Sequence, residues 1–290
     1  MTDESRYTSN LAGFYKLTTD ERRRMVASMC RLSSEEVKLL EDDAKLGVAG
    51  PKMVENYIGI MPVPLGVATN FLIDNMERLV PMATEEPSVI AAASHGAKIV
   101  RAGGGFFTEV DEPVMIGQIQ IPECNEPEMV KERLLHNKEV IIKKANSFDP
   151  VLVKLGGGCR DIEVRIVDIS GSCEKKSMVV VHLLVDVRDA MGANAVNTMA
   201  EGVSRLIEEI AGCSVHLRIL SNLAVKRIAR ARCLIPFEAL GDNGRVVANG
   251  IEDAWRFAYC DIFRAATHNK GIMNGISAVA LATGNDTRAL

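Results

Sequence analysis

The chain has 290 residues, of which 47% are apolar and 25% charged, and its formal net charge is −4. This composition suits a globular protein of one large or two medium domains, and the small negative charge gives no general attraction to nucleic acid or anionic lipid. Its seven cysteines form no C-x-x-C pair, and no apolar run reaches the ~18 residues of a membrane span. We expect a cytoplasmic protein with reduced thiols, no leader peptide, no membrane segment and no metal site.

The first part of the chain has a helical pattern. Thr18 with Glu21, and Ser33 with Glu36, fit the capping box that satisfies the free N–H groups at a helix start. A further helix is predicted over residues 86–101, with a proline in its first turn and basic residues in its last turn. Three consecutive glycines follow this helix and are expected to end it.

From about residue 112 the pattern changes to short β-rich runs around one helical stretch. Such alternation over this length predicts a compact α+β domain. After residue 221 a helical pattern with many small residues returns and continues to the end. The predicted fold is therefore α+β: a large, mainly helical domain, formed by residues 1–112 and 222–290, is interrupted by a smaller domain of residues 113–221. The β-rich runs are residues 114–121, 162–169 and 178–187, and the helical stretch is residues 126–146.

A strand, a tight loop and a helix start follow one another in the predicted small domain. The β-branched strand over residues 178–187 leads into a loop with Gly192, and apolar residues at helical spacing come next. A helix N-terminus after a glycine loop attracts phosphate, although an ordinary strand-to-helix turn has the same pattern. Gly156, Gly157 and Gly158 lack the third glycine of a Rossmann fingerprint and precede a strand, so they are interpreted as a tight connection with positive φ.

Cationic and amide side chains are crowded among small residues at positions 264–275. Lys270 and Asp286 would lie ~24 Å apart on one continuous helix, so they can meet only if the chain turns back. The alternative is an exposed lysine and a helix-ending aspartate. The basic stretch over residues 226–232 could bind nucleic acid, but its helical spacing with alanine and isoleucine favours a solvated helix face.

Five short motifs identify a family. Residues 55–59 resemble its ENVIG motif, with Tyr57 in place of Val, and residues 85–88 match its EEPS motif. Residues 189–194 match its DAMGAN motif, residues 268–271 match HNKG, and residues 284–286 match GND. In this order and spacing, the motifs make the chain resemble class II (bacterial and archaeal) 3-hydroxy-3-methylglutaryl-coenzyme A (HMG-CoA) reductases over nearly its whole length.

The resemblance implies an NAD(P)H-dependent oxidoreductase of the mevalonate pathway of isoprenoid biosynthesis. Such an enzyme reduces HMG-CoA to mevalonate and free coenzyme A with two hydrides, or runs the reverse reaction. The resemblance also implies a homodimer or higher oligomer with active sites at the subunit interface. It implies that the small domain binds the dinucleotide with a ferredoxin-like, non-Rossmann fold. Neither nucleic acid nor a membrane is expected as a partner.

Matching the motifs gives each residue an implied role. Lys270 stabilises the oxyanion formed at the thioester carbonyl, Glu86 donates the proton in the aldehyde-level reduction, and Asp286 links the two by hydrogen bonds. The positions implied to hold the substrate are Ser88, Arg264, Thr267 and Asn274. Those implied to hold the dinucleotide are Asp149, Asp189, Ala190, Met191, Gly192, Ala193 and Asn194. A carboxylate at Asp149 accepts from a ribose 2′-OH and repels a 2′-phosphate, which favours NADH.

The resemblance also implies a histidine, on a C-terminal segment beyond residues 284–286, that protonates the departing coenzyme A thiolate. The chain ends at Leu290, so we expect either a fragment that lacks this segment or a chain whose missing part lies on another polypeptide. The alternative is a catalytically dead subunit that binds a nucleotide or coenzyme A. Retention of Glu86, Lys270 and Asp286 together favours the enzyme.

Overall fold

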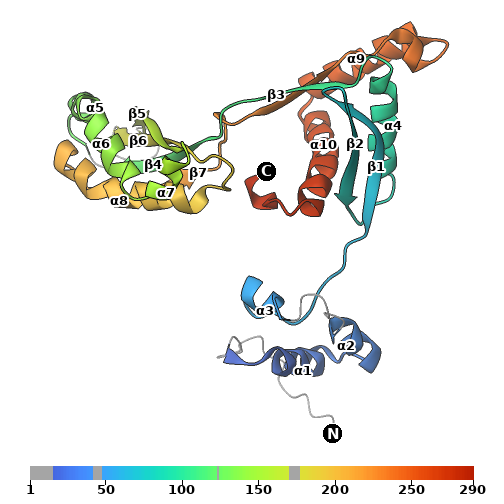
Figure 1. Ribbon diagram of the computed structural model, residues 1–290, viewed down its shortest axis with the longest axis horizontal. Coiled ribbons are helices and arrows are strands. Elements are labelled where there is room, and N and C mark those ends of the chain that lie inside the picture. Colours follow the sequence, from blue (N-terminus) through green and yellow to red (C-terminus); the bar gives the residue numbers. More distant parts are fainter. Residues whose placement is uncertain (1–15, 42–47, 123, 170–176) are drawn as a thin grey trace. The chain divides into compact units, whose positions relative to one another are not determined.

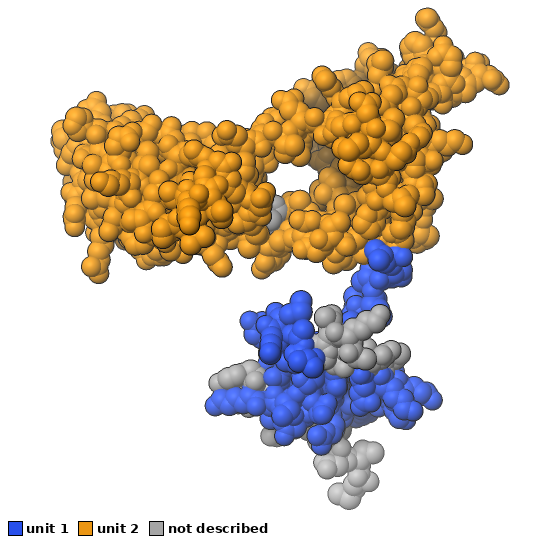
Figure 2. All heavy atoms as spheres, in the orientation of Figure 1, with its two compact units in different colours: residues 1–65 blue, residues 66–290 orange. Residues whose placement is uncertain are grey.

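A computed structural model describes residues 16–41, 48–122, 124–169 and 177–290 of the chain (Figure 1). The chain divides into two compact units, residues 1–65 and 66–290, which Figure 2 distinguishes by colour. Helices and two four-stranded sheets make up the described residues, which confirms the predicted α+β class. No helix within these ranges is both long enough and apolar enough to span a bilayer.

Both capping boxes expected in the first unit are confirmed. At α1 (Thr19–Cys30) the Thr18 N–H donates to Glu21 Oε2 at 2.7 Å, and the Glu21 N–H donates to Thr18 Oγ1 at 3.3 Å. Ser33 and Glu36 form the same two bonds at α2 (Ser34–Glu41), again at 2.7 and 3.3 Å. Each box satisfies donors that a helix start would otherwise leave unpaired.

The ENVIG-like segment is anchored to α1. Tyr57, which departs from the motif, is only 8% exposed. A Cβ built on Gly50, the first residue of α3 (Gly50–Met53), would lie 2.5 Å from the Tyr57 ring, so the tyrosine requires a glycine there. Arg22 Nη1 donates to the Tyr57 carbonyl at 3.1 Å, and Arg23 Nε donates to the Ile58 carbonyl at 2.5 Å.

The second unit contains a four-stranded sheet in the order β2-β1-β3-β8. Strand β1 is parallel to β3, and β3 is antiparallel to β8. Helices α4 and α10 pack with this sheet around Ala68, Met82 and Ala278, whose exposed fractions are 0%, 2% and 3%. The elements are β1 (Leu65–Ile73), β2 (Met76–Ala83), α4 (Val89–Arg101), β3 (Phe106–Val110), β8 (Ala229–Cys233), the 3-10 turn Phe237–Leu240, α9 (Gly244–Cys260), α10 (Ile262–Ala282) and a last 3-10 turn, Thr287–Ala289.

A second, antiparallel sheet has the order β5-β6-β4-β7. Along the chain its elements follow one another as a strand, helices, two strands, a helix and a strand. With this strand order they form the ferredoxin-like βαββαβ arrangement, as predicted. Helix α8 presents Val196, Met199 and Val203 to its core, all with 0% exposure. The elements are β4 (Val114–Ile121), α5 (Pro127–His136), α6 (Lys138–Asn146), α7 (Pro150–Lys154), β5 (Gly158–Asp168), β6 (Ser177–Asp186), α8 (Ala193–Ala211) and β7 (Arg218–Ser221).

Two sequence predictions about local structure were wrong. The helix expected to begin at residue 86 begins at Val89, because Ser88 has a left-handed backbone (φ 73°) that interrupts the helical turn. Only the second half of the basic stretch expected on a helix is regular, and it forms β8 (Ala229–Cys233), while Lys226 and Arg227 lie in the turn before it. Arginine and alanine alternate along it, a period of two that suits a strand, and Arg230 forms an ion pair with Asp111 next to β3.

The buried histidine of β6 gives the fold a pH dependence. His182 is 5% exposed and its Nε2 lies 3.0 Å from Gln118 Nε2, and burial lowers the pKa of this imidazole below its ordinary value. The unfolded chain then binds a proton at His182 more readily than the folded chain does. The contribution of neutral His182 to the free energy of unfolding is therefore fully present above the pKa that this histidine has in the unfolded chain, and it is lost as the pH falls below that value. Thermal unfolding should therefore show a falling Tm from about pH 6.5 downward. His182→Gln should reduce that fall, whereas His136→Gln, on an exposed site of α5, should not; equal pH profiles for the two variants would contradict the assignment.

Candidate active site

The motif around Glu86 lies in the turn between β2 and α4. Ser88 caps α4 with φ 73°, a conformation that costs a residue other than glycine about 1–3 kcal/mol. Its hydroxyl makes no capping bond to the helix, although serine is a preferred capping residue. Glu85 and Glu86 are both exposed ahead of the helix. Strained backbone and an unused hydroxyl at one turn are typical of a ligand-binding position.

Apart from Asp286, the other predicted catalytic and substrate residues lie along α10. The helix runs without interruption through Gly271 and Gly275, so neither glycine breaks it. Thr267, Lys270 and Asn274 are three and four residues apart and therefore share one side of the helix. Arg264 lies one turn earlier, half-buried, with its backbone N–H held by Asp261 Oδ1 at 2.7 Å.

The structure brings Glu86 together with two of these residues. Lys270 Nζ lies 3.6 Å from Glu86 Oε2, and Asn274 Nδ2 donates to the same oxygen at 3.5 Å. The side chains of Lys270 and Glu86 are 66% and 49% exposed. An ion pair this exposed contributes only about 0–1 kcal/mol to stability. Its geometry nevertheless places a cation beside a carboxyl group from a distant motif.

Asp286 has a different partner from the one expected. The chain turns back after α10 at Gly284 (φ 69°), which leads into the last 3-10 turn. Asp286 receives two guanidinium hydrogen bonds from Arg288, at 2.8 and 2.7 Å, and these lower the pKa of its carboxyl group. Among the described residues no hydrogen bond or ion pair joins Asp286 to Glu86 or Lys270. The predicted linking role of Asp286 stays a prediction.

Asp286 lines a pocket of about 370 Å³ together with residues of the loop expected to bind the dinucleotide. The residues of the loop that line it are Met191 and Ala193. Three polar residues that the motifs did not single out line it too: Asn222, Arg227 and Arg288. Asn222 directly follows β7, and Arg227 belongs to the basic stretch that was interpreted as a solvated face. A polar side chain immediately after a strand was the available signal for Asn222.

The loop itself has the geometry of an anion-binding helix start. Gly192 is the N-cap of α8 with φ 94°, and a Cβ there would lie 2.5 Å from Met115 Sδ and 2.7 Å from Val187 Cγ1. Only glycine fits without displacing its neighbours. The N–H groups of the first helical turn have no intrahelical partner and no side-chain cap, and the helix dipole favours negative charge there. Asp189, Ala190, Met191 and Asn194 are exposed around this position.

Asp149 is the N-cap of α7. Its Oδ1 accepts the Leu152 N–H at 2.9 Å, and the residue is half-buried. One carboxylate oxygen is therefore used within the fold, while the other has no hydrogen-bond partner among the described residues.

The neighbouring glycines confirm the expected tight connection, because Gly156 and Gly158 have φ of 85° and 104°.

Comparison with known proteins identifies the family. The pattern of the hydroxymethylglutaryl-coenzyme A reductase family matches residues 18–290. The chain belongs to the HMG-CoA reductase family. It is 53% identical over 285 residues to the 3-hydroxy-3-methylglutaryl-coenzyme A reductase of Archaeoglobus fulgidus, an alignment that covers 98% of this chain and 64% of that protein. It is 35% identical over 251 residues to the probable reductase of Borreliella burgdorferi, covering 82% of this chain and 54% of that one.

Solved HMG-CoA reductase structures share the fold. The reductase of Streptococcus pneumoniae superposes with a TM-score of 0.80 at 39% identity, covering 96% of this chain and 66% of that one. A class II reductase from the same organism, bound to NADPH in open conformations, gives a TM-score of 0.80 at 38% identity and covers 96% of this chain and 75% of that one. This HMG-CoA reductase family member thus spans less than two thirds of the length of the Archaeoglobus relative.

Proposed function

We propose that this protein is an HMG-CoA reductase that uses NAD(P)H to convert HMG-CoA to mevalonate and free coenzyme A. The observation that carries the proposal is the 3.6 Å approach of Lys270 Nζ to Glu86 Oε2, which joins the EEPS and HNKG motifs. The reaction needs a cation beside the reacting carbonyl and a proton donor within reach of the same oxygen. One pair of side chains supplies both.

Lys270 is proposed to stabilise negative charge on the substrate oxygen. Asn274 contacts the same Glu86 carboxyl group from the next turn of α10, so the three side chains surround one small volume. A cation held beforehand at the place where charge develops acts mainly on the transition state. Thr267 and Arg264, on the turns before Lys270, are placed to hold the acyl portion of the substrate, with Arg264 a natural partner for its carboxylate.

The loop at the start of α8 fits a dinucleotide. Gly192 lets the chain turn tightly against Met115 and Val187 into α8, and the free N–H groups of the first turn suit a diphosphate. The bound nicotinamide would supply hydride. Asp149 is proposed to accept a hydrogen bond from the adenosine ribose, and its charge would favour NADH over NADPH.

Asp149→Asn should lower the ratio of the NADH affinity to the NADPH affinity about tenfold, because the repulsion between the carboxylate and the 2′-phosphate of NADPH is lost. Asparagine also caps helices well, so its side-chain oxygen should still accept the Leu152 N–H and the Tm should be unchanged. Asp149→Ala should change the preference similarly but also lose about 1 kcal/mol of stability with the cap. Calorimetric affinities for both dinucleotides measure the effect. An unchanged ratio in Asp149→Asn would show that the carboxylate does not face the ribose.

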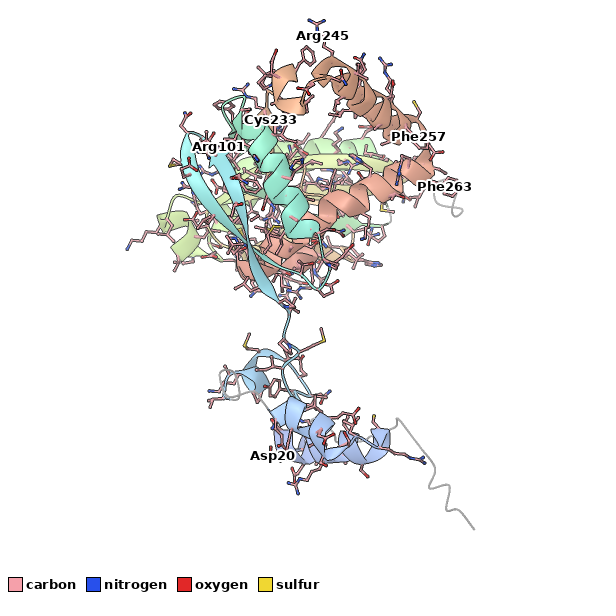
Figure 3. The ribbon with its side chains drawn as sticks, turned by 90° about the vertical axis from the view of Figure 1, so that its right-hand side faces the viewer. Asp20, Arg101, Cys233, Arg245, Phe257 and Phe263 are labelled. Atoms are coloured by element: carbon pink, nitrogen blue, oxygen red, sulfur yellow. The ribbon has the colours of Figure 1, made fainter. Side chains whose placement is uncertain are left out.

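The active form is proposed to be a homodimer whose active sites lie at the subunit interface. Large apolar side chains on α9 and α10 are exposed in the single chain: Trp255 57%, Phe257 57%, Tyr259 79%, Ile262 78% and Phe263 78%. Figure 3 shows Phe257 and Phe263 where the two helices meet. Monomeric proteins seldom expose so many aromatic side chains together, and interfaces are enriched in them. A second copy over α10 would also exclude water from Lys270, as its proposed role requires.

The dimer is tested by its mass in solution. Phe263→Asp should convert the dimer to monomer in light scattering, while Val110→Asp, at a 72% exposed site on β3, should not. Trp255 is the only tryptophan in the chain, so its fluorescence emission should shift to longer wavelength as the dimer dissociates on dilution. A monomeric mass for the unaltered protein at high concentration would contradict the proposed homodimer.

The function is tested directly by HMG-CoA-dependent loss of nicotinamide absorbance, with mevaldehyde as a second substrate and calorimetry to measure dinucleotide binding. Turnover of both substrates is expected. Dinucleotide binding with no turnover of either would instead indicate a subunit that only binds.

A further inference from the structure

Arg188 has an unusual backbone at a critical place. It lies between the end of β6 and the proposed dinucleotide loop, residues 189–194, and its φ is 52°. Few residues other than glycine adopt this left-handed conformation, because it strains the chain and persists only where the surroundings impose it. The direction in which the loop leaves the sheet depends on this residue.

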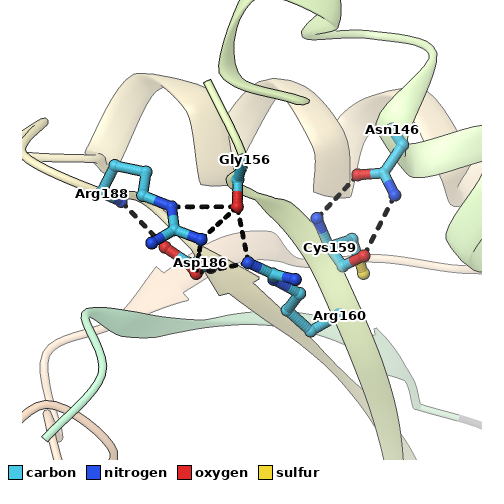
Figure 4. A network of polar contacts seen from close by, with 6 residues as sticks. All are labelled: Asn146, Gly156, Cys159, Arg160, Asp186 and Arg188. Atoms are coloured by element: carbon cyan, nitrogen blue, oxygen red, sulfur yellow. Dashed lines mark hydrogen bonds and ion pairs between the residues drawn. The ribbon is translucent and has the colours of Figure 1, made fainter. Parts of the chain in front are cut away.

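A buried carboxylate holds Arg188 in this conformation. Asp186, the last residue of β6, is only 2% exposed. Its Oδ1 accepts the backbone N–H of Arg188 at 3.0 Å, and its Oδ2 lies 3.2 Å from Arg188 Nη2 (Figure 4). The same side chain thus fixes both the backbone and the guanidinium group of the strained residue.

The start of β5 completes the clamp. The Gly156 carbonyl accepts from Arg188 Nε at 2.9 Å and from Arg160 Nη2 at 2.5 Å, while Arg160 Nη2 also lies 2.9 Å from Asp186 Oδ2. Pairing of β5 with β6 shifts register between Cys159 and Asp161, so Arg160 occupies a β-bulge, a feature that redirects a side chain. Figure 4 shows both arginines converging on Asp186 and Gly156.

We propose that Asp186 is a positioning residue for dinucleotide binding: it clamps Arg188 in the left-handed conformation and so sets the path of the loop at residues 189–194. The inference rests on the proposed function, in which that loop binds NAD(P)H. A purely structural role explains the arrangement less well, since burying a carboxylate is costly and apolar packing at such a position is often as stable or more so. The clamp joins β5, β6 and the loop at a residue whose backbone is strained.

The clamp is tested first without any dinucleotide, by amide hydrogen exchange on Asp186→Ala, which removes both acceptor oxygens. The Arg188 N–H, bound to Asp186, and the Ala190 N–H, bound to the Val187 carbonyl at 3.1 Å, should exchange about tenfold faster than in the unaltered chain. The Val181 N–H, in the middle of β6, should be unchanged and shows that the sheet is intact. Equal protection of Arg188 and Ala190 in both proteins would overturn the inference.

The second test asks whether the clamp acts through the Arg188 backbone. Asp186→Ala should weaken the calorimetric affinity for NADH and NADPH about tenfold. The same substitution in an Arg188→Gly background should change it by less than about twofold, because glycine adopts φ near 50° without a clamp. Equal weakening in both backgrounds would mean that Asp186 supports the fold in general and would overturn the inference. If the unaltered chain binds neither dinucleotide, the proposed function fails, and hydrogen exchange alone decides whether Asp186 sets the loop.

Discussion

Lys270→Ala should lower kcat for HMG-CoA reduction by about 10²–10³-fold, with a much smaller change in KM. The proposed cation acts on charge that develops only as the thioester carbonyl is reduced, so its loss affects the transition state more than substrate binding. The structure shows that Lys270 is 66% exposed and paired only loosely with Glu86, so its removal should cost little stability. Steady-state kinetics and Tm, measured together, separate the two effects.

The matched control for this prediction is Lys98→Ala. Lys98 is an exposed lysine on α4, a helix that packs against α10. Its loss changes the net charge equally and should leave kcat within about twofold. Retention of most of the kcat in Lys270→Ala would falsify the oxyanion role.

Glu86→Gln should abolish reduction of supplied mevaldehyde as well as the full reaction, lowering kcat by about 10²–10⁴-fold. Glutamine keeps the shape of the side chain and can still bond to Asn274, but it carries no transferable proton. The neighbour Glu85, also exposed, offers a control in Glu85→Gln, which should behave as the unaltered protein. Normal turnover of mevaldehyde by Glu86→Gln would mean that the proton comes from another group.

A proton donor must be neutral at the pH of the reaction, and the position of Glu86 bears on this. In the single chain Glu86 is exposed in the turn ahead of α4. α4 begins only at Val89, and Asp286 is paired with Arg288. Cover from a second subunit remains as the physical means of desolvating the carboxyl group, which joins the Glu86 prediction to the proposed dimer.

Local sequence signals predicted the small sheet well. The run at residues 114–121 is β4 without change, and the helix after Gly192 buries the apolar residues expected, Val196 and Met199. These elements are amphipathic or continuously apolar, so their periodicity reports their surroundings directly. The glycine connection with positive φ was predicted for the same reason, since only glycine adopts that backbone freely.

The first sheet could not be predicted from local pattern. In β1 the alternation of exposed and more buried residues is confined to the first half of the strand, and β2 has no regular alternation. β3 pairs with a strand more than a hundred residues further along the chain. Exposure of β8 is nearly uniform, so its arginines were equally compatible with a helix face. Strand pairing between such distant segments is a property of the whole fold and leaves little trace in either segment.

The candidate site was predicted by motif and completed only by geometry. Glu86 lies beside Lys270 and Asn274, whereas Asp286 pairs with Arg288, a residue no motif singled out. Asn222 and Arg227 became visible only as walls of the pocket beside Met191. A pattern of residue types identifies what is present, whereas partners are decided by side-chain directions that the sequence does not specify.

Because α10 is one uninterrupted rod, Thr267, Lys270 and Asn274 keep fixed spacings and can move relative to Glu86 only as a single body. The rod is held at its far end, where Ala278 and Ala280 are 3% and 6% exposed. One extra residue inserted between Asn274 and Ala278 would rotate the whole preceding face by about 100° and shift it by about 1.5 Å. All three side chains would then leave the carboxyl group together. A change in helix length should therefore remove all three side chains from the site at once, whereas a point substitution on this face removes only one.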